Sequence, residues 1–242
     1  MKSELVVANS PKSPEAEMFR SLRTNIQFMN ADSKKKVMQI TSTVPGEGKS
    51  YVTANLATAF AQINKKVLII DVDMRKGRQY SIFNLNPRPG ISNFLSGVVD
   101  SDFSLDKDDI ESYIQSTDIE NLFVITSGSV PPNPSELLVS NKMSRVIDSL
   151  LDKFDVLIFD APPCLIVADA LIMSRLVDFN LIVSAQNITK MEDLAKAKNA
   201  IENVNGKVAG VILNKVQITA KTYENAYYYG EKISATKPKQ RK

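Results

Sequence analysis

Short apolar stretches alternate with stretches of helical periodicity along most of the chain. The apolar stretches are rich in Val, Ile and Leu, and they occupy residues 37–42, 67–70, 122–126, 156–159, 180–184 and 208–214. Helical patterns fall between or before them, in residues 13–30, 49–63, 91–95, 133–151, 169–178 and 192–204. Strands that are apolar on both faces and alternate with helices are typical of parallel sheets. We therefore predict an α/β fold with a mainly parallel sheet and helices on both faces.

A glycine-rich turn joins the first predicted strand to the helix that follows it. The sequence of this junction is TSTVPGEGKS, in which Thr43 replaces the first glycine of the GxxxxGK[ST] consensus. GEGKS alone is compatible with an ordinary turn, but the strand–turn–helix order predicts a P-loop NTPase fold, whose backbone N–H groups surround phosphates. Lys49 is then expected to reach the β- and γ-phosphates and Ser50 to bind Mg²⁺. The predicted nucleotide-binding residues are Pro45, Gly46, Glu47, Gly48, Lys49, Ser50 and Tyr51.

Three aspartates stand at the ends of two apolar stretches. Asp71 and Asp73 follow residues 67–70, and Asp160 follows residues 156–159 in a Walker B pattern. The carboxyl ends of parallel strands meet at the edge that also holds the phosphate loop, so we expect these carboxylates near Mg²⁺. We predict Ser50, Asp71 and Asp160 as metal ligands. Asp71 is the first candidate to accept a proton and Asp73 to support the metal shell, although the two roles could be exchanged; with Lys49 and Asp160 they form the predicted catalytic set.

The amino-acid composition excludes several kinds of catalytic and metal site. The 242-residue chain contains no His and a single Cys, which excludes His-based metal sites, Ser-His-Asp triads and an intramolecular disulfide framework. The formal net charge of +3 is too small to indicate a nucleic-acid partner. There is no secretory signal, and no apolar run approaches the roughly 18 residues that would span a bilayer. We expect a cytoplasmic protein that reaches the membrane only through a partner.

The predicted helix over residues 13–30 has two different faces. Its apolar stripe consists of Met18, Leu22, Ile26 and Met29. The segment EMFRSLR places Glu17, Arg20 and Arg23 on the opposite face, pointing away from the core. This charged face is either a solvated surface with weak ion pairs or a contact between subunits.

Tyrosines are concentrated near the C-terminus. Four of the seven tyrosines of the chain lie in a polar stretch where no core periodicity requires them. This cluster is compatible with a docking patch, an extra edge strand or a set of phosphorylation substrates. We predict a single domain over residues 1–218 and a flexible, basic tail over residues 219–242. The clustered residues are Tyr223, Tyr227, Tyr228 and Tyr229.

Taken together, six segments closely resemble the bacterial tyrosine kinases (BY-kinases) of capsular and exopolysaccharide synthesis, in the form where the kinase is a separate cytoplasmic chain. The segments are TSTVPGEGKS, VLIIDVDMR, VLIFDAPP, EMFRSLR, PPNPSELL and the YxxxYYYG tail. The resemblance implies ATP and Mg²⁺ as cofactors and autophosphorylation of the four tail tyrosines in trans, within a homo-oligomeric ring formed through Glu17, Arg20 and Arg23. It also implies a membrane adaptor of the polysaccharide co-polymerase type and a cognate phosphotyrosine phosphatase.

Two other interpretations remain open at this point. The Walker motifs are shared with the MinD/ParA superfamily, whose partitioning ATPases use ATP hydrolysis as an assembly switch. Those ATPases carry a signature lysine directly after the first P-loop glycine, where this chain has Val44. A nucleotide-dependent regulator that acts through binding alone is the other alternative, and the complete set of Lys49, Ser50 and three aspartates argues against it.

Overall fold

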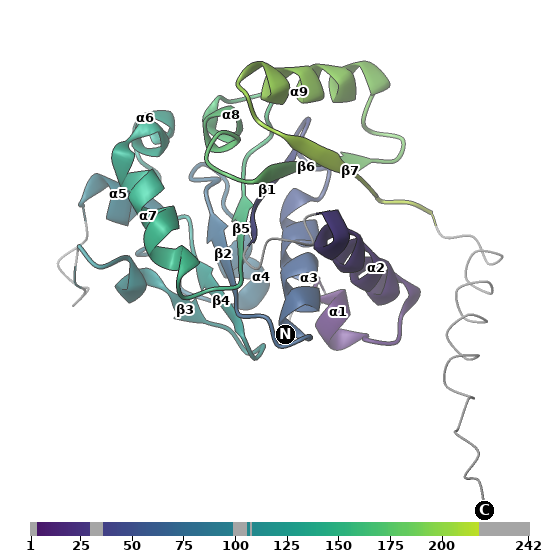
Figure 1. The fold of residues 1–242 in the computed structure, drawn as a ribbon, viewed down its shortest axis with the longest axis horizontal. Helices are drawn as coiled ribbons and strands as arrows, with labels where there is room; N and C mark the ends of the chain where they lie inside the picture. Colours follow the sequence, from purple (N-terminus) through teal and green to yellow (C-terminus); the bar gives the residue numbers. More distant parts are fainter. Residues whose placement is uncertain (1–3, 30–35, 99–105, 107, 218–242) are drawn as a thin grey trace, which may run out of the picture.

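A seven-stranded sheet forms the centre of the described part of the chain (Figure 1). The computed structural model describes residues 4–29, 36–98, 106 and 108–217. The strand order is β3-β4-β2-β5-β1-β6-β7, with β3 antiparallel to β4 and the other neighbours parallel. The mainly parallel sheet predicted from the apolar stretches is confirmed. The strands are β1 (Lys36–Ser42), β2 (Val67–Asp71), β3 (Gln115–Ser116), β4 (Leu122–Ile125), β5 (Val156–Asp160), β6 (Phe179–Ala185) and β7 (Val208–Asn214).

Helices cover both faces of the sheet, and each face has its own apolar core. One core gathers Val7, Ile26 and Leu56 against one face, and the other gathers Leu138 and Val146 against the opposite face. Helices on both faces were expected, because the central strands are buried on each side. The helices are α1 (Val6–Asn9), α2 (Pro14–Met29), α3 (Lys49–Ala61), α4 (Gln79–Phe83), α5 (Ile91–Ser96), the 3₁₀ helix η1 (Ile110–Tyr113), α6 (Pro134–Val139), α7 (Asn141–Leu151), α8 (Asp169–Met173) and α9 (Met191–Asn203).

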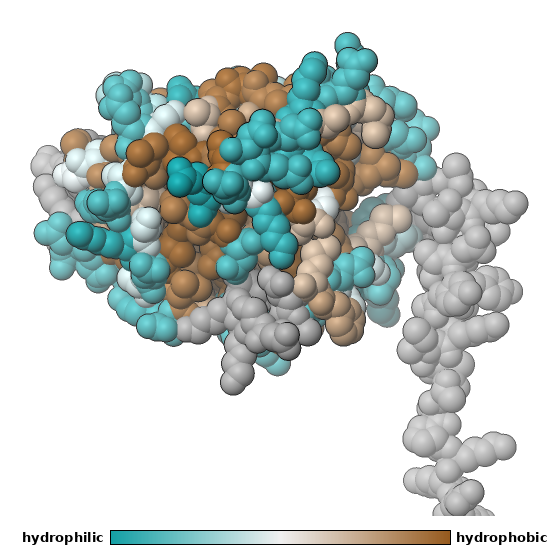
Figure 2. Space-filling model, turned by 45° about the horizontal axis from the view of Figure 1, so that its top comes forward, coloured by the Kyte–Doolittle hydropathy of each residue, from teal (hydrophilic) through white to brown (hydrophobic). Residues whose placement is uncertain are grey.

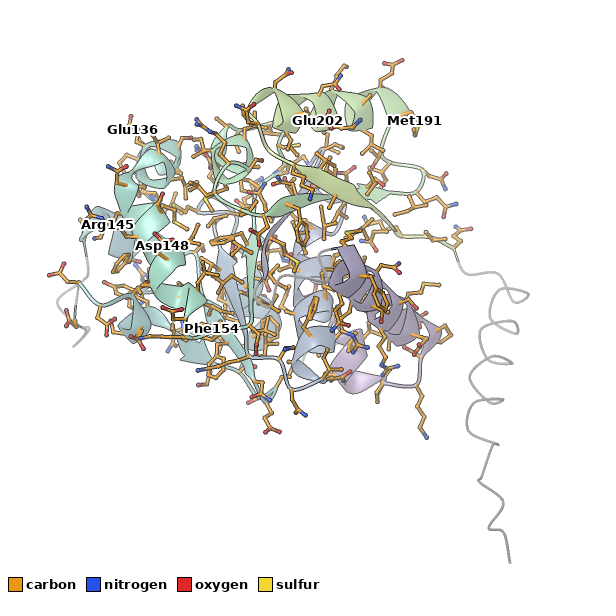
Figure 3. The ribbon with its side chains drawn as sticks, viewed as in Figure 1. Glu136, Arg145, Asp148, Phe154, Met191 and Glu202 are labelled. Atoms are coloured by element: carbon orange, nitrogen blue, oxygen red, sulfur yellow. The ribbon has the colours of Figure 1, made fainter. Side chains whose placement is uncertain are left out.

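The outer helices are amphipathic. On α7, Val146 and Leu150 are buried, whereas Arg145 and Asp148 are exposed and point away from the sheet (Figure 3). Helix α3, by contrast, is not amphipathic: small and apolar side chains are buried around almost the whole helix. A helix that is buried on all sides is held rigidly by its neighbours, so the P-loop at its N-terminus has a firm support.

The helix predicted over residues 133–151 is interrupted, which corrects the sequence interpretation. Ser140 has an extended backbone with ψ of 145°, so α6 ends before it and α7 begins after it. The Ser140 hydroxyl donates to the Leu137 carbonyl at 2.7 Å and satisfies an acceptor at the end of α6. Asn133 precedes α6 as expected, but its side chain makes no capping hydrogen bond. A polar side chain that bonds the backbone locally thus replaces one helical hydrogen bond.

The face of α2 that packs on the protein also differs from the predicted stripe. Phe19 and Ile26 are buried, whereas Met18 and Met29 are 48% and 45% exposed. Phe19 packs edge to face on Tyr51 of α3, with ring centroids 5.7 Å apart. This contact turns the helix toward α3, because an aromatic ring buries more apolar area than a methionine at the rim.

The sequence pattern predicted that Arg23 points away from the core, but in the structure it points toward α3. Its guanidinium donates to the Ala59 carbonyl of α3 at 2.9 Å. Burial lowers its pKa, and the charge of Arg20 adds to this effect while Glu17 opposes it. Arg20 instead pairs with the exposed Glu17 at 2.9 Å. The three charged residues of α2 therefore have two different environments.

We expect Arg23→Ala to lower the free energy of unfolding by about 1–2 kcal/mol, because it removes a charge-assisted hydrogen bond between α2 and α3. Lys198→Ala on α9 is the control, since the exposed ion pair between Lys198 and Glu202 contributes well under about 1 kcal/mol. Urea denaturation of both variants measures the difference. Equal stability of the two variants would contradict the distinction between their environments.

Within the described residues, no helix is both long enough and apolar enough to cross a membrane. The surface is nevertheless not uniformly polar: Figure 2 shows one face on which brown apolar patches separate the hydrophilic areas. Some exposed apolar side chains belong to β7, where Val211 and Leu213 are about half exposed. These two residues also line the pocket that contains the P-loop.

Candidate nucleotide and phosphoryl-transfer site

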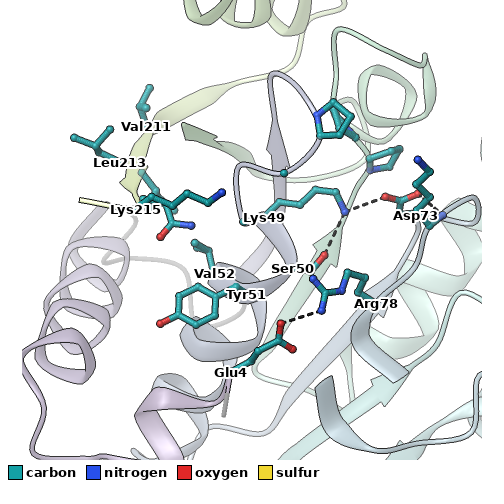
Figure 4. Close-up of a pocket in the computed structure, with 18 of the residues that line it drawn as sticks. Glu4, Lys49, Ser50, Tyr51, Val52, Asp73, Arg78, Val211, Leu213 and Lys215 are labelled. Carbon is teal, nitrogen blue, oxygen red and sulfur yellow. Dashed lines mark hydrogen bonds and ion pairs between the residues drawn. The ribbon is translucent and has the colours of Figure 1, made fainter. Parts of the chain in front are cut away.

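A pocket of about 1030 Å³ opens at the carboxyl ends of the central strands. Its floor is the P-loop between β1 and α3, and its walls come from the loop after β2, the segment after β5, α2 and the end of β7. In Figure 4, Val211 and Leu213 lie on one side of Lys49 and Asp73 lies on the other. The pocket therefore has a β7 end and an Asp73 end, with Lys49 between them.

The P-loop is shaped from beneath by Glu47. This carboxylate is completely buried and accepts from the backbone N–H groups of Thr43 at 2.6 Å and Val44 at 3.0 Å. It also accepts from the hydroxyls of Thr43, at 2.9 Å, and Thr189. Thr43 thus replaces the consensus glycine because its hydroxyl holds Glu47. Glu47 is absent from the pocket lining, so its predicted role as a nucleotide contact is not supported for the side chain.

Gly48 must be a glycine for two reasons. Its φ is +93°, in the left-handed region that other residues rarely adopt. A Cβ at this position would lie 2.1 Å from Nδ2 of Asn214, the last residue of β7. That same amide donates to the Glu47 carbonyl at 2.9 Å. The end of β7 is therefore tied directly to the phosphate loop.

Lys49 joins the P-loop to the carboxylates. Its Nζ lies 2.9 Å from Asp73 Oδ2 and 3.5 Å from Asp160 Oδ1, and it is 3.3 Å from Ser50 Oγ. Burial alone lowers the pKa of Lys49, but the charges of Asp160, Asp73 and Asp71 outweigh burial and raise the pKa above its ordinary value. The ammonium is consequently charged at neutral pH.

Asp71 lies deeper than Asp73. It is fully buried, and its oxygens accept from the backbone N–H groups of Asp73, Arg78 and Gln79 at 3.2, 2.8 and 3.0 Å. Burial, reinforced by the charge of Asp160 on the neighbouring strand, raises the pKa of Asp71 to about 8. Asp73, by contrast, lines the pocket. Direct contact with a substrate hydroxyl must come before pKa in choosing a proton acceptor, so the geometry favours the exchanged roles, with Asp73 at the substrate.

Gln79 is a site residue that the sequence interpretation missed. Its Nε2 donates to Asp160 Oδ2 at 2.8 Å and to the Ser50 carbonyl at 3.2 Å. It therefore orients the Walker B carboxylate and joins α4 to the start of α3. A glutamine at the start of a short helix carries no spacing signal, and only its position eight residues after Asp71 connects it to the site.

The β7 end of the pocket is largely apolar. Met18, Phe19 and Leu22 of α2 face Val211 and Leu213 of β7 across it. Apolar walls next to a few polar groups are typical of ligand sites that accept a flat ring. The sequence interpretation placed no ligand contacts here, because α2 and β7 are far apart along the chain.

The structure brings together most of the predicted site residues but not all of them. Those that line the pocket are Pro45, Gly46, Gly48, Lys49, Ser50, Tyr51 and Asp73. Asp71 and Asp160 lie directly behind this lining. Glu17, Arg20 and Arg23 lie outside the pocket lining. The predicted tail tyrosines, Tyr223 and Tyr227 to Tyr229, lie outside the described residues, so their role stays a prediction, as does the domain boundary at residue 218.

The donor atoms at the site suit Mg²⁺. Ser50 and Asp160 present oxygen atoms beside the P-loop, and oxygen donors are what this cation prefers. Among the described residues, no three acidic or Cys side chains form a self-sufficient metal site. Mg²⁺ sites generally combine one or two carboxylates with substrate phosphates. Asp71, whose oxygens are held by backbone N–H groups, fits less well as a direct ligand than was predicted.

Comparisons with known proteins place this site in context. A family model described as an AAA domain matches residues 35–216. The tyrosine-protein kinase YwqD of Bacillus subtilis is 38% identical over 96% of this chain and 93% of its own length. The kinase domain of the Escherichia coli tyrosine kinase ETK has a similar structure, with a TM-score of 0.81 at 31% identity, over 89% of this chain and 82% of that one.

The fold is shared more widely. The cell division ATPase MinD of Pyrococcus furiosus has a TM-score of 0.61 at 25% identity, over 81% of this chain and 79% of that one. The P-loop NTPase fold predicted from the sequence is thereby confirmed. Both tyrosine kinases are more similar to this chain in sequence than this ATPase is, and ETK also has the higher TM-score.

Proposed function

Because the chain belongs to the family of bacterial tyrosine-protein kinases, we propose that it transfers the γ-phosphoryl group of ATP to the tyrosines of its own C-terminal tail. The observation that carries this proposal is the position of Lys49. Its ammonium lies between Asp73 and Asp160 at the P-loop, in a pocket that continues past Asp73. A cation there neutralises phosphate charge while the far end of the pocket admits an acceptor.

The nucleotide fits the pocket in one direction. We place the phosphates in the P-loop, where Gly46 and Gly48 leave room for backbone N–H groups to face them. The base then occupies the apolar β7 end between Leu22 and Leu213. Ser50 and Asp160 would hold Mg²⁺, which supplies positive charge to the phosphates when it is bound.

The acceptor tyrosine approaches from the Asp73 end. Its hydroxyl oxygen forms the new bond to the γ-phosphorus, the bond from that phosphorus to the oxygen of ADP breaks, and the phenolic proton passes to a carboxylate. Asp73 is the group in position to orient or accept this proton, because it lines the pocket beside Lys49. Asp71 supports the loop that holds Asp73 through the hydrogen bond from the Asp73 N–H.

We further propose that phosphorylation occurs in trans. The support is the exposed Glu17–Arg20 pair on α2, a helix that also forms a wall of the pocket. A homo-oligomer, in the form of a ring, that uses this face brings one chain's tail to the next chain's pocket. By the resemblance of its motifs, the kinase would regulate capsular or exopolysaccharide synthesis from the inner face of the membrane. A polysaccharide co-polymerase adaptor would recruit it, and a phosphotyrosine phosphatase would reverse its action.

Intact-mass spectrometry tests the tail as acceptor. The wild type and a variant with Tyr223, Tyr227, Tyr228 and Tyr229 changed to Phe are each incubated with Mg·ATP, with and without an adaptor tail peptide. We expect added phosphates on the wild type and none on the four-Phe variant. Tyr80→Phe is the control, because Tyr80 is partly exposed and outside the pocket lining, and it should gain phosphates as the wild type does.

Two results would count against the proposal. Phosphates on the four-Phe variant would place the acceptors elsewhere. ATP consumption without any mass gain would instead favour the MinD/ParA-type ATPase, in which water is the acceptor.

A further inference from the structure

A buried carboxylate links the motif PPNPSELL to the rim of the pocket. Asp169, at the start of α8, is fully buried. Its Oδ1 accepts from the hydroxyl of Ser135, within that motif, at 2.5 Å. Its Oδ2 lies 3.5 Å from Nε of Arg75, two residues after Asp73. Three segments that are distant along the chain therefore meet at one carboxylate.

The environment of Asp169 requires Arg75 to stay in place. Among the described residues, Asp169 Oδ2 has no hydrogen-bond partner, so the ion pair with Arg75 is its compensation. Removing a carboxylate from water is costly unless a cation compensates it. The Nε side of the guanidinium is thus held toward α8, while the side chain as a whole remains 42% exposed. A half-exposed arginine with one anchored edge is oriented rather than freely rotating.

Arg75 lies on the side of the pocket that the proposed nucleotide direction assigns to the γ-phosphate. It lines the pocket together with Asp73 and Pro163, away from the apolar β7 end. The nucleotide direction proposed above puts the γ-phosphate between Lys49 and this rim. The forked donors of a guanidinium match phosphate oxygens, and an arginine at this point stabilises the charge of the transition state.

We propose that Arg75 contacts the phosphoryl group during its transfer to tyrosine, and that Asp169, supported by Ser135, is the residue that positions Arg75. This inference rests on the proposed kinase activity of the same pocket. It also assigns a role to the PPNPSELL segment: the Ser135 hydroxyl orients the carboxylate of Asp169, and that carboxylate orients Arg75. Lys49 and the P-loop bind the nucleotide independently of this relay.

A double-mutant cycle tests the relay. The variants are Arg75→Gln, Asp169→Asn and the two combined, and the measurements are kcat for tyrosine phosphorylation and the Kd of Mg·ADP. We expect Arg75→Gln to lower kcat by about 10³-fold, as the loss of a transition-state arginine does. Asp169→Asn should lower kcat roughly tenfold, within the range of couplings between contacting residues. The combined variant should be no slower than Arg75→Gln alone, and the Kd of Mg·ADP should be unchanged in all three.

Asp155→Asn is the matched control. Asp155 forms an ion pair with Lys65 at 3.5 Å, the same distance as between Asp169 and Arg75, and neither Asp155 nor Lys65 lines the pocket. It should leave kcat unchanged. Additive losses in the combined variant, or equal losses in Mg·ADP affinity and kcat, would overturn the relay. If Asp169→Asn does not fold, Ser135→Ala takes its place in the cycle, with the same expectation of no further loss beside Arg75→Gln. A wild type that transfers no phosphate would refute the proposed function itself.

Discussion

Lys49→Met should abolish tyrosine phosphorylation. The ammonium is the cation that lies within 3.5 Å of both Asp73 and Asp160 at the P-loop, and no methionine can neutralise phosphate charge there. Losing one preorganised electrostatic contact costs about 10²–10³ in kcat, and Lys49 is also expected to contribute to nucleotide binding, so incorporation should fall below detection. Intact-mass spectrometry with Mg·ATP measures the loss.

The variant should still fold, although with lower stability near neutral pH, because Asp73 and Asp160 lose a compensating charge. Far-UV circular dichroism checks the fold. Lys65→Met is the matched control: Lys65 pairs with Asp155 on the surface, and its loss should leave phosphorylation intact. Phosphate incorporation by a folded Lys49→Met protein would show that the active site is elsewhere.

Asp71→Asn should make the protein more stable above pH 8, which is the reverse of what most buried polar substitutions do. The pKa of Asp71 is raised to about 8, first by burial and then by the charge of Asp160. The pKa of Asp71 is therefore higher in the folded protein than in the unfolded chain. Its contribution to the free energy of unfolding is fully present below the unfolded-state pKa, and it is lost as the pH rises through the folded-state pKa of about 8. The wild type therefore loses stability between about pH 4 and pH 8, and the neutral amide does not.

The buried charge of Asp71 and the hydrogen bond that the amide loses have opposite effects on stability, and their relative size decides whether Asp71→Asn stabilises or destabilises the protein. Each unit of pKa shift corresponds to about 1.4 kcal/mol. In the variant, an NH₂ group replaces one carboxylate oxygen. The protein then loses one hydrogen bond, the 3.2 Å bond from the Asp73 N–H, which costs about 1 kcal/mol. Above pH 8 the relief of the buried charge should outweigh that loss, whereas near pH 4 the lost hydrogen bond should dominate and the wild type should be the more stable.

Urea denaturation in EDTA at pH 4, 6 and 8.5 checks this crossover. Asp148→Asn is the control, because Asp148 is exposed on α7 and should change stability little at any pH. A wild type that remained more stable than Asp71→Asn at pH 8.5 would show that the carboxylate is compensated in the folded protein, and the assigned pKa would be wrong.

The sequence by itself determined the fold and the edge of the sheet at which the main candidate site residues lie. Six of the seven strands were expected from continuous apolar stretches, since burial on both faces removes the need for polar alternation. Lys49, Ser50, Asp71 and Asp160 were expected at one edge because parallel strands end together there. These are local or short-range patterns, and each one can be recognised from a few neighbouring residues.

Only the tertiary structure decided which groups face the pocket and which support it. Glu47 belongs to the P-loop motif, yet it turns inward because Thr43 and Thr189 offer it hydrogen bonds. Asp71 and Asp73 alternate along the chain, but β2 ends at Asp71, so Asp73 alone of the two lines the pocket.

The same is true of contacts between distant segments. Arg23 is turned toward Ala59 by the packing of α2 on α3. Asp169 meets Arg75 and Ser135 only when α8, α6 and the loop after β2 come together. Such contacts leave no periodic trace in the sequence. Their geometry depends on how helices and strands pack, and packing is set by the shape and burial of all the side chains together.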